Sequence, residues 1–169
     1  MKRVLIDSKP YDEFYTPSYA ITPLLEYIPK NQNLIIWEPT DFGGSNITKV
    51  LEDNGFSVVH TSKEEIDFLK DEPNFEFDMI VTNPPYSLKD EFLERCYELG
   101  KPFCLLLPIT SLEGIKRGKM FRENGIEVLV FDKRCNFMNT KSNWFNTSWF
   151  CWHVLPEKLI FKELNKDGD

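Results

Sequence analysis

Short apolar segments alternate with helical stretches along most of this chain, and this alternation limits the possible folds more than any other feature. Apolar segments of strand length lie at residues 33–39, 56–60, 78–82, 103–108, 126–131 and 147–155. Helix-like periodicity is found at residues 46–53, 89–99 and 118–124, with Gly, Pro or Asn in the linking turns. Regular alternation of this kind is typical of an α/β fold, in which a mostly parallel sheet carries helices on both faces.

The composition fits one α/β domain of ordinary size. With 169 residues, of which 41% are hydrophobic and 14% aromatic, the chain can bury a core, which excludes global disorder. No apolar run reaches the roughly 18–20 residues of a membrane-spanning helix, and Asp7 comes too early for a signal peptide. We therefore expect residues 1–169 to form a single cytoplasmic domain. The four cysteines lack Cys-x-x-Cys spacing, so we expect reduced thiols and no metal site.

Charge is distributed unevenly along the chain. Asp and Glu outnumber Lys and Arg by 27 to 20, and this net charge of −7 argues against a protein that coats nucleic acid nonspecifically. Residues 101–141 nevertheless hold eight basic and four acidic side chains, a net charge of +4. This segment is either an ordinary solvated helix surface or a local patch that faces phosphates.

The segment after the first predicted strand has the composition of a ligand-binding loop. Ligands of such sheets bind beyond the carboxyl ends of the strands. Here Glu38 and Pro39 end the strand, and Gly43 and Gly44 precede a helix. Glycines let a backbone approach a ligand closely, and an acid can bind a ribose hydroxyl or an amine. A purely structural glycine turn fits this segment equally well.

The most specific motif is Asn83-Pro84-Pro85-Tyr86, which follows the third predicted strand. Its two prolines fix the backbone and remove two N–H donors. An exocyclic amine on an aromatic ring is a poor nucleophile. Two acceptors, the Asn83 side-chain oxygen and a proline carbonyl, could bind its hydrogens and leave the nitrogen lone pair available. Tyr86 offers a flat ring for stacking a base, whereas the alternative is a structural turn rich in proline.

Asp67 and Phe68 form a weaker candidate between the second and third predicted strands. An acid can accept a hydrogen bond from an adenine amino group, and a phenyl ring can stack on adenine. The same pair also fits a helix N-cap followed by a core phenylalanine.

Together these segments resemble the class I S-adenosylmethionine-dependent methyltransferases. More narrowly, the chain is similar to the small DNA adenine N6-methyltransferases common in phage and mobile-element genomes, whose catalytic motif Asn83-Pro84-Pro85-Tyr86 matches. The resemblance covers nearly the whole chain. It implies a Rossmann-like, mostly parallel seven-stranded sheet with an antiparallel last strand, and S-adenosyl-L-methionine as cofactor. The cofactor-binding residues that it implies are Tyr15, Thr16, Pro17, Glu38, Pro39, Phe42, Gly43, Gly44, Ser62, Asp67 and Phe68.

Two positions depart from the family pattern. Phe42 stands where the family's cofactor loop usually has a glycine. Ser62 stands where the family ends its second strand in an acid that holds the ribose hydroxyls.

The family's sequence-specific members carry a separate target-recognition domain, for which this chain leaves no room. Specificity would then come from short loops or from a partner subunit. The loop 135–146, between the last two predicted strands, mixes aromatic, amide and basic side chains that suit base stacking and phosphate contact. A hairpin connection with part-buried aromatics fits this loop as well. The substrate-binding candidates are Lys133, Arg134, Phe137, Lys141 and Trp144.

The resemblance implies methyl transfer to an exocyclic amine, first of all adenine N6 in DNA, by direct in-line attack on the methyl group. The same motif serves RNA adenines, guanine amines of ribosomal RNA and glutamine side chains of release factors, so these acceptors stay open. Phe42 and Ser62 also leave open a function of another class. In that case a methyltransferase-like module would bind nucleic acid or a partner protein without catalysis.

Overall fold

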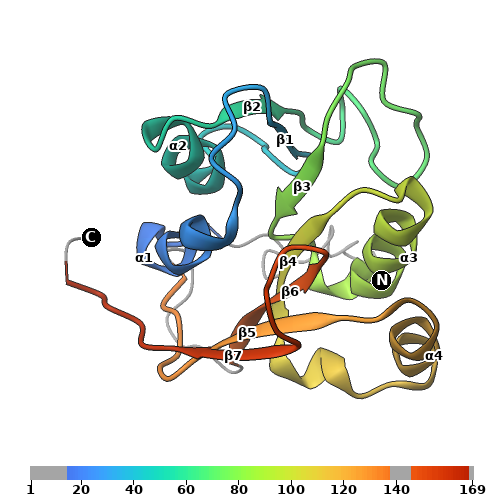
Figure 1. Cartoon of the computed structure of the whole chain (residues 1–169). Helices are drawn as coiled ribbons and strands as arrows, with labels where there is room; N and C mark the ends of the chain where they lie inside the picture. The colour runs from blue at the N-terminus through green and yellow to red at the C-terminus, as the bar shows by residue number, and fades with distance from the viewer. Residues whose placement is uncertain (1–14, 138–145, 168–169) are drawn as a thin grey trace, which may run out of the picture.

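The computed structural model describes residues 15–137 and 146–167, which form a seven-stranded sheet with helices on both faces (Figure 1). The strands are β1 (Ile35–Glu38), β2 (Ser57–His60), β3 (Met79–Thr82), β4 (Phe103–Pro108), β5 (Glu127–Phe131), β6 (Thr147–Trp152) and β7 (Leu159–Lys162). Their order across the sheet is β2-β1-β3-β4-β6-β5-β7. Among these strands only β6 runs antiparallel to its neighbours, so the predicted Rossmann-like sheet is confirmed.

The helices divide between the two faces of the sheet (Figure 1). On one face lie α1 (Ser18–Ile21), the 3-10 helix η1 (Thr22–Tyr27) and α2 (Asn46–Asp53). On the other lie the 3-10 helix η2 (Tyr86–Leu88), α3 (Lys89–Leu99) and α4 (Ile115–Asn124), with the 3-10 helix η3 (Ile109–Leu112) leading into α4.

Each face of the sheet has its own buried core. Along β4, Leu106 packs with the residues of α1 and α2, whereas Leu105 and Leu107 pack with those of α3 and α4. Successive side chains of a strand point to opposite faces, so a strand covered on both sides must be apolar throughout. All six residues of β4 are buried, as the unbroken apolar run predicts.

The C-terminal region differs from the sequence-based prediction. The last predicted strand, 147–155, was three residues too long, because the chain leaves the sheet after Trp152 and turns at His153, where φ is +55°. The buried carboxylate of Glu127 accepts the backbone N–H groups of His153, Val154 and Leu155 at 2.9–3.1 Å. After this turn, the chain forms β7, which pairs in parallel with β5. The sequence pattern did not identify β7.

No helix in residues 15–137 and 146–167 is both long and apolar enough to cross a membrane. The four cysteines are buried and form no disulfide. Two of them, Cys104 and Cys151, face each other across β4 and β6 with their sulfur atoms 3.4 Å apart.

Candidate functional site

The carboxyl ends of β1 and β3 lie side by side, since the two strands pair in parallel, and a pocket opens beside them. It holds about 270 Å³ of empty space that is open to solvent. The lining joins the segment before α1, the loop after β1, the start of α2 and the first residue of the Asn-Pro-Pro-Tyr motif. The residues are Tyr15, Thr16, Glu38, Thr40, Phe42, Ser45, Asn46, Ile47 and Asn83.

Glu38 ends β1 as a buried carboxyl group with 1% of its surface exposed. Its Oε1 accepts hydrogen bonds from the Thr40 backbone N–H at 2.9 Å and the Thr82 hydroxyl at 2.5 Å. Its Oε2 accepts one from the Ser45 hydroxyl at 3.1 Å. Burial raises the pKa of Glu38 to about 7, although these hydrogen bonds favour the charged form and oppose the shift. Both protonation states are therefore accessible near neutral pH.

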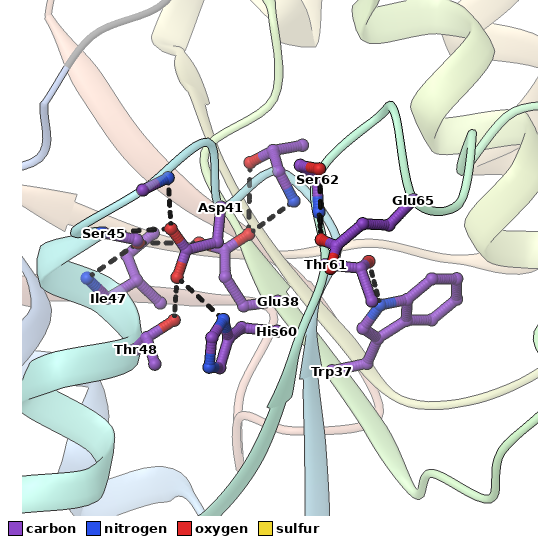
Figure 2. Close-up of polar contacts among 12 residues, drawn as sticks. Trp37, Glu38, Asp41, Ser45, Ile47, Thr48, His60, Thr61, Ser62 and Glu65 are labelled. Carbon is purple, nitrogen blue, oxygen red and sulfur yellow. Dashed lines mark hydrogen bonds and ion pairs between the residues drawn. The ribbon is translucent and has the colours of Figure 1, made fainter.

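The loop between β1 and α2 is held by a second buried carboxylate, Asp41, which the sequence analysis did not select. Its Oδ1 accepts the backbone N–H groups of Gly43 at 2.9 Å and Ser45 at 3.2 Å. Its Oδ2 accepts the Thr48 hydroxyl at 2.9 Å and lies 3.4 Å from Nδ1 of His60 (Figure 2). The signal that could have identified Asp41 is its spacing from Gly43, because aspartate often binds the backbone two residues further on.

Gly43 and Gly44 leave the outer part of this loop without side chains. Their φ angles of +112° and +79° lie in the region that favours glycine. A Cβ built at either position meets no other atom within 4 Å, so the space beside the loop is open. Ser45 directly precedes α2, and its hydroxyl accepts the Ile47 N–H at 3.2 Å as an N-cap.

Asn83 follows β3 directly and contacts two other segments of the site. Its Nδ2 donates to the Thr16 hydroxyl at 3.0 Å, and Nδ2 of Asn46 donates to the Thr16 carbonyl at 2.8 Å. The Thr40 hydroxyl lies 3.3 Å from the Asn83 carbonyl oxygen. These contacts bring the N-terminal segment, which includes the buried Pro17, together with the loop after β1 and the Asn-Pro-Pro-Tyr motif.

The remaining residues of the motif turn the chain from β3 into α3. Pro84 is buried, Pro85 is half-buried, and Tyr86 begins η2. The Tyr86 ring is 8% exposed and belongs to the core that contains Phe92 and Leu107. Burial, with a smaller contribution from the nearby Cys135 thiol, raises the pKa of Tyr86 well above its ordinary value.

Tyr15 and Phe42 form the exposed part of the pocket lining. Their ring centroids lie 5.1 Å apart in an edge-to-face arrangement, and the side chains are 38% and 46% exposed. Phe42, which replaces a glycine of the family pattern, therefore takes up space in the pocket wall. Pro39, at the start of the same loop, is buried.

Ser62 follows β2 and does not belong to the pocket lining within the described residues. Its backbone N–H and hydroxyl donate to Oε2 of Glu65 at 2.8 and 3.1 Å, and these bonds lower the pKa of Glu65. An acid therefore lies beside the position that Ser62 occupies, although it comes from three residues further along the chain.

Asp67 and Phe68 lie in a series of turns between β2 and β3 and, in the part of the chain that the structure describes, line no part of this pocket. The Phe68 ring is 3% exposed and stacks on Phe92 with centroids 4.8 Å apart. Oδ1 of Asp67 accepts the Leu69 N–H at 3.1 Å. This geometry resembles the core-phenylalanine alternative, with a turn in place of the expected helix.

The substrate-binding candidates occupy different environments. Lys133 donates through Nζ to a backbone carbonyl after β7 at 3.1 Å, and Arg134 is exposed. Phe137 is 3% exposed and belongs to the core beneath α1. Lys141 and Trp144 lie outside the described residues.

Three basic side chains of α4 pair with acids. The pairs are Lys116–Glu94 at 2.8 Å, Arg117–Asp90 at 2.5 Å and Lys119–Glu123 at 3.6 Å. The first two pairs join α4 to α3. Part of the positive charge of segment 101–141 therefore serves contacts between helices, as the interpretation of an ordinary helix surface predicts.

The strand order and the single reversed strand of the described sheet define a Rossmann-like methyltransferase fold. A solved structure from Listeria monocytogenes, provisionally described as a class I S-adenosylmethionine-dependent methyltransferase, matches this chain with a TM-score of 0.60. The match covers 96% of this chain and 69% of that one at 15% sequence identity, so the likeness concerns the fold. Neither the protein-family models nor the curated protein sequences contain a match.

Proposed function

We propose that this chain is an S-adenosylmethionine-dependent methyltransferase that methylates an exocyclic amine, with adenine N6 of DNA as the acceptor. One observation carries the proposal: Asn83 of the Asn-Pro-Pro-Tyr motif shares a pocket with Glu38 and the loop after β1, at the carboxyl edge of a methyltransferase-like sheet. That edge is where α/β folds bind their ligands.

The chemistry of the pocket suits this cofactor. Gly43 and Gly44 leave open space beside the loop, and Thr16 and Asn46 supply polar atoms for the amino-acid part of a ligand. The pocket is small and open to solvent, so this ligand would extend beyond it.

S-adenosylmethionine, when bound, supplies a methyl group on a positively charged sulfur. The Asn83 side chain and the Pro84 carbonyl would accept the two hydrogens of the amine and direct its lone pair toward that methyl group. The new N–C bond forms as the S–C bond breaks, and the methylated amine then gives up one proton to water. The protein contributes mainly orientation, and Thr16 holds the Asn83 side chain in place.

The proposal is tested with purified protein, a labelled methyl donor, and unmethylated DNA, RNA and protein as acceptors in parallel. We expect label in DNA, and a loss on the order of 100-fold in Asn83→Ala, comparable to removing one key hydrogen-bonding group from an active site. Asn33→Ala, which changes an exposed residue before β1, is the matched control. Donor binding measured by calorimetry without transfer to any acceptor would show that the protein is not this enzyme.

A protein glutamine is the second acceptor, and the charge distribution favours it. Acids neutralise Lys116, Arg117 and Lys119, which leaves less positive charge to hold a nucleic-acid backbone. The parallel acceptors separate this case from DNA and from RNA. If DNA is the acceptor, the short loops or a partner subunit would supply the sequence recognition.

A non-catalytic binding module is the alternative outside enzymes. The Tyr15–Phe42 ring pair in the pocket wall favours it, because these rings take up space that a cofactor would need. Calorimetric titration with S-adenosylmethionine tests this alternative: absence of donor binding excludes the methyltransferase, because catalysis requires the donor to bind.

A further inference from the structure

We propose that Thr40 is a positioning residue that holds the Asn83–Pro84 peptide group in register with the loop after β1. The inference deepens the proposed function and rests on it. Thr40 lies in the loop after β1, and Asn83 lies after β3, so the contact joins two segments 43 residues apart. Neither the Asn-Pro-Pro-Tyr motif nor the glycine positions point to this threonine.

The Thr40 hydroxyl lies among three acceptors. It is 2.6 Å from the Thr82 hydroxyl oxygen, 3.1 Å from Glu38 Oε1 and 3.3 Å from the Asn83 carbonyl oxygen. A hydroxyl has one hydrogen and donates to one strong partner at a time, although it can also accept. When Thr82 donates to an ionised Glu38, its oxygen takes the Thr40 hydrogen. When Glu38 is protonated and donates to Thr82, Thr82 donates to Thr40 and the Thr40 hydrogen is directed to the Asn83 carbonyl.

The Thr40 hydroxyl is connected to a hydrogen-bond network of buried groups. Thr82 is fully buried at the end of β3, and its hydroxyl shares one hydrogen bond with Oε1 of Glu38 at 2.5 Å. The second oxygen of Glu38 accepts the hydroxyl of Ser45, which also caps α2. The carboxyl of Glu38 thus links the start of α2, the end of β3 and, through Thr40, the peptide group after Asn83.

The Asn83–Pro84 and Pro84–Pro85 peptide bonds lack N–H groups, so this turn has two fewer backbone donors with which to fix itself. A donor from the neighbouring loop is a direct way to restrain its carbonyl groups. In the proposed reaction the next carbonyl along the chain, that of Pro84, accepts a hydrogen of the amine. A rotation of the Asn83–Pro84 peptide group would displace it.

The experiment compares Thr40→Val with Thr40→Ser. Valine keeps the β-branched shape and removes the hydroxyl, whereas serine restores the hydroxyl. We expect Thr40→Val to lower kcat by roughly 10- to 100-fold, the cost of a small misplacement of reacting groups, with donor affinity nearly unchanged. Thr40→Ser should recover most of the rate. Thr61→Val is the matched control, since it removes the hydroxyl of a buried threonine at the same edge, which accepts a bond from the Trp37 indole N–H instead.

A second measurement does not depend on activity. Asn83–Pro84 is the single Asn-Pro pair in the sequence, so labelling the Asn carbonyl carbon and the Pro nitrogen yields one correlated NMR signal. The carbonyl resonance should shift in Thr40→Val and return in Thr40→Ser. An unchanged resonance, or an unchanged kcat in Thr40→Val, overturns the positioning role. A protein whose resonance shifts as expected but which transfers no methyl group to any acceptor contradicts the proposed function and leaves the Thr40 contact supported.

Discussion

Replacing Glu38 with glutamine tests the burial of the carboxyl group that links the loop after β1 to β3. The carboxyl is buried, and its pKa is raised from 4.5 to about 7 by loss of hydration. Glutamine has nearly the same shape, and its oxygen can accept the bonds from the Thr40 N–H and the Thr82 hydroxyl. Its amide nitrogen can donate to the Ser45 oxygen in place of the bond that Glu38 accepts there.

The sign and size of the effect follow from the pKa of Glu38. Below pH 4.5 the group is protonated in both the folded and unfolded states and adds no pH dependence. Between pH 4.5 and about 7 the unfolded chain loses this proton while the folded chain keeps it, so the free energy of unfolding falls as pH rises. Each unit of pKa shift corresponds to about 1.36 kcal/mol, so the free energy of unfolding falls by about 3 kcal/mol in total. This fall is complete above pH 7.

The assay is urea unfolding of the wild type and Glu38→Gln at several pH values from 4.5 to 8. Taking the difference between the two proteins removes the contribution of other titrating groups. We expect the free energy of unfolding of Glu38→Gln, relative to that of the wild type, to rise by about 3 kcal/mol from pH 4.5 to 8. This rise does not depend on the difference between the two proteins at low pH. Glu52→Gln, which alters an exposed carboxylate of α2, is the control for loss of one negative charge. A difference that stays constant with pH would refute the burial argument.

Two further substitutions test the loop after β1. Asp41→Ala removes the acceptor of two backbone N–H groups and should cost roughly 1–3 kcal/mol of unfolding free energy by urea titration; an unchanged value would mean that the carboxylate does not hold the loop. Phe42→Ala should cost about 0.5–1.5 kcal/mol of unfolding free energy, since the ring packs edge-to-face on Tyr15, and should tighten donor binding in calorimetry. Weaker donor binding in Phe42→Ala would instead identify the ring as a ligand contact.

The sequence was most informative where local pattern and strand direction act together. Periodicity located the strands and helices, and parallel strands place their carboxyl ends at one edge. For this reason Glu38 and Asn83, which follow β1 and β3, could be expected in the same site, and both line the pocket with Tyr15, Thr16 and Phe42. The glycine pair could likewise be expected beside them, because it follows β1 directly.

Contacts between distant segments could not be predicted in this way. β7 lacked a clear pattern because, among the described strands, it lies at the edge of the sheet and pairs with β5 alone. The turn at His153 depends on a carboxylate 26 residues earlier. Phe68 fitted both a cofactor contact and a core residue, and only the packing of β1 and α3 against it placed its ring in the core.

The amino-acid sequence by itself determined the α/β architecture and the edge of the sheet at which chemistry-bearing residues gather, because hydrophobic periodicity and strand polarity are local properties. Tertiary structure alone decided how these residues act on one another. It buried Glu38 until its pKa reached about 7 and placed the Thr40 hydroxyl between that carboxyl and the Asn83 carbonyl. The hydration and hydrogen bonding of a side chain depend on neighbours from distant parts of the chain. A local sequence pattern therefore cannot predict them.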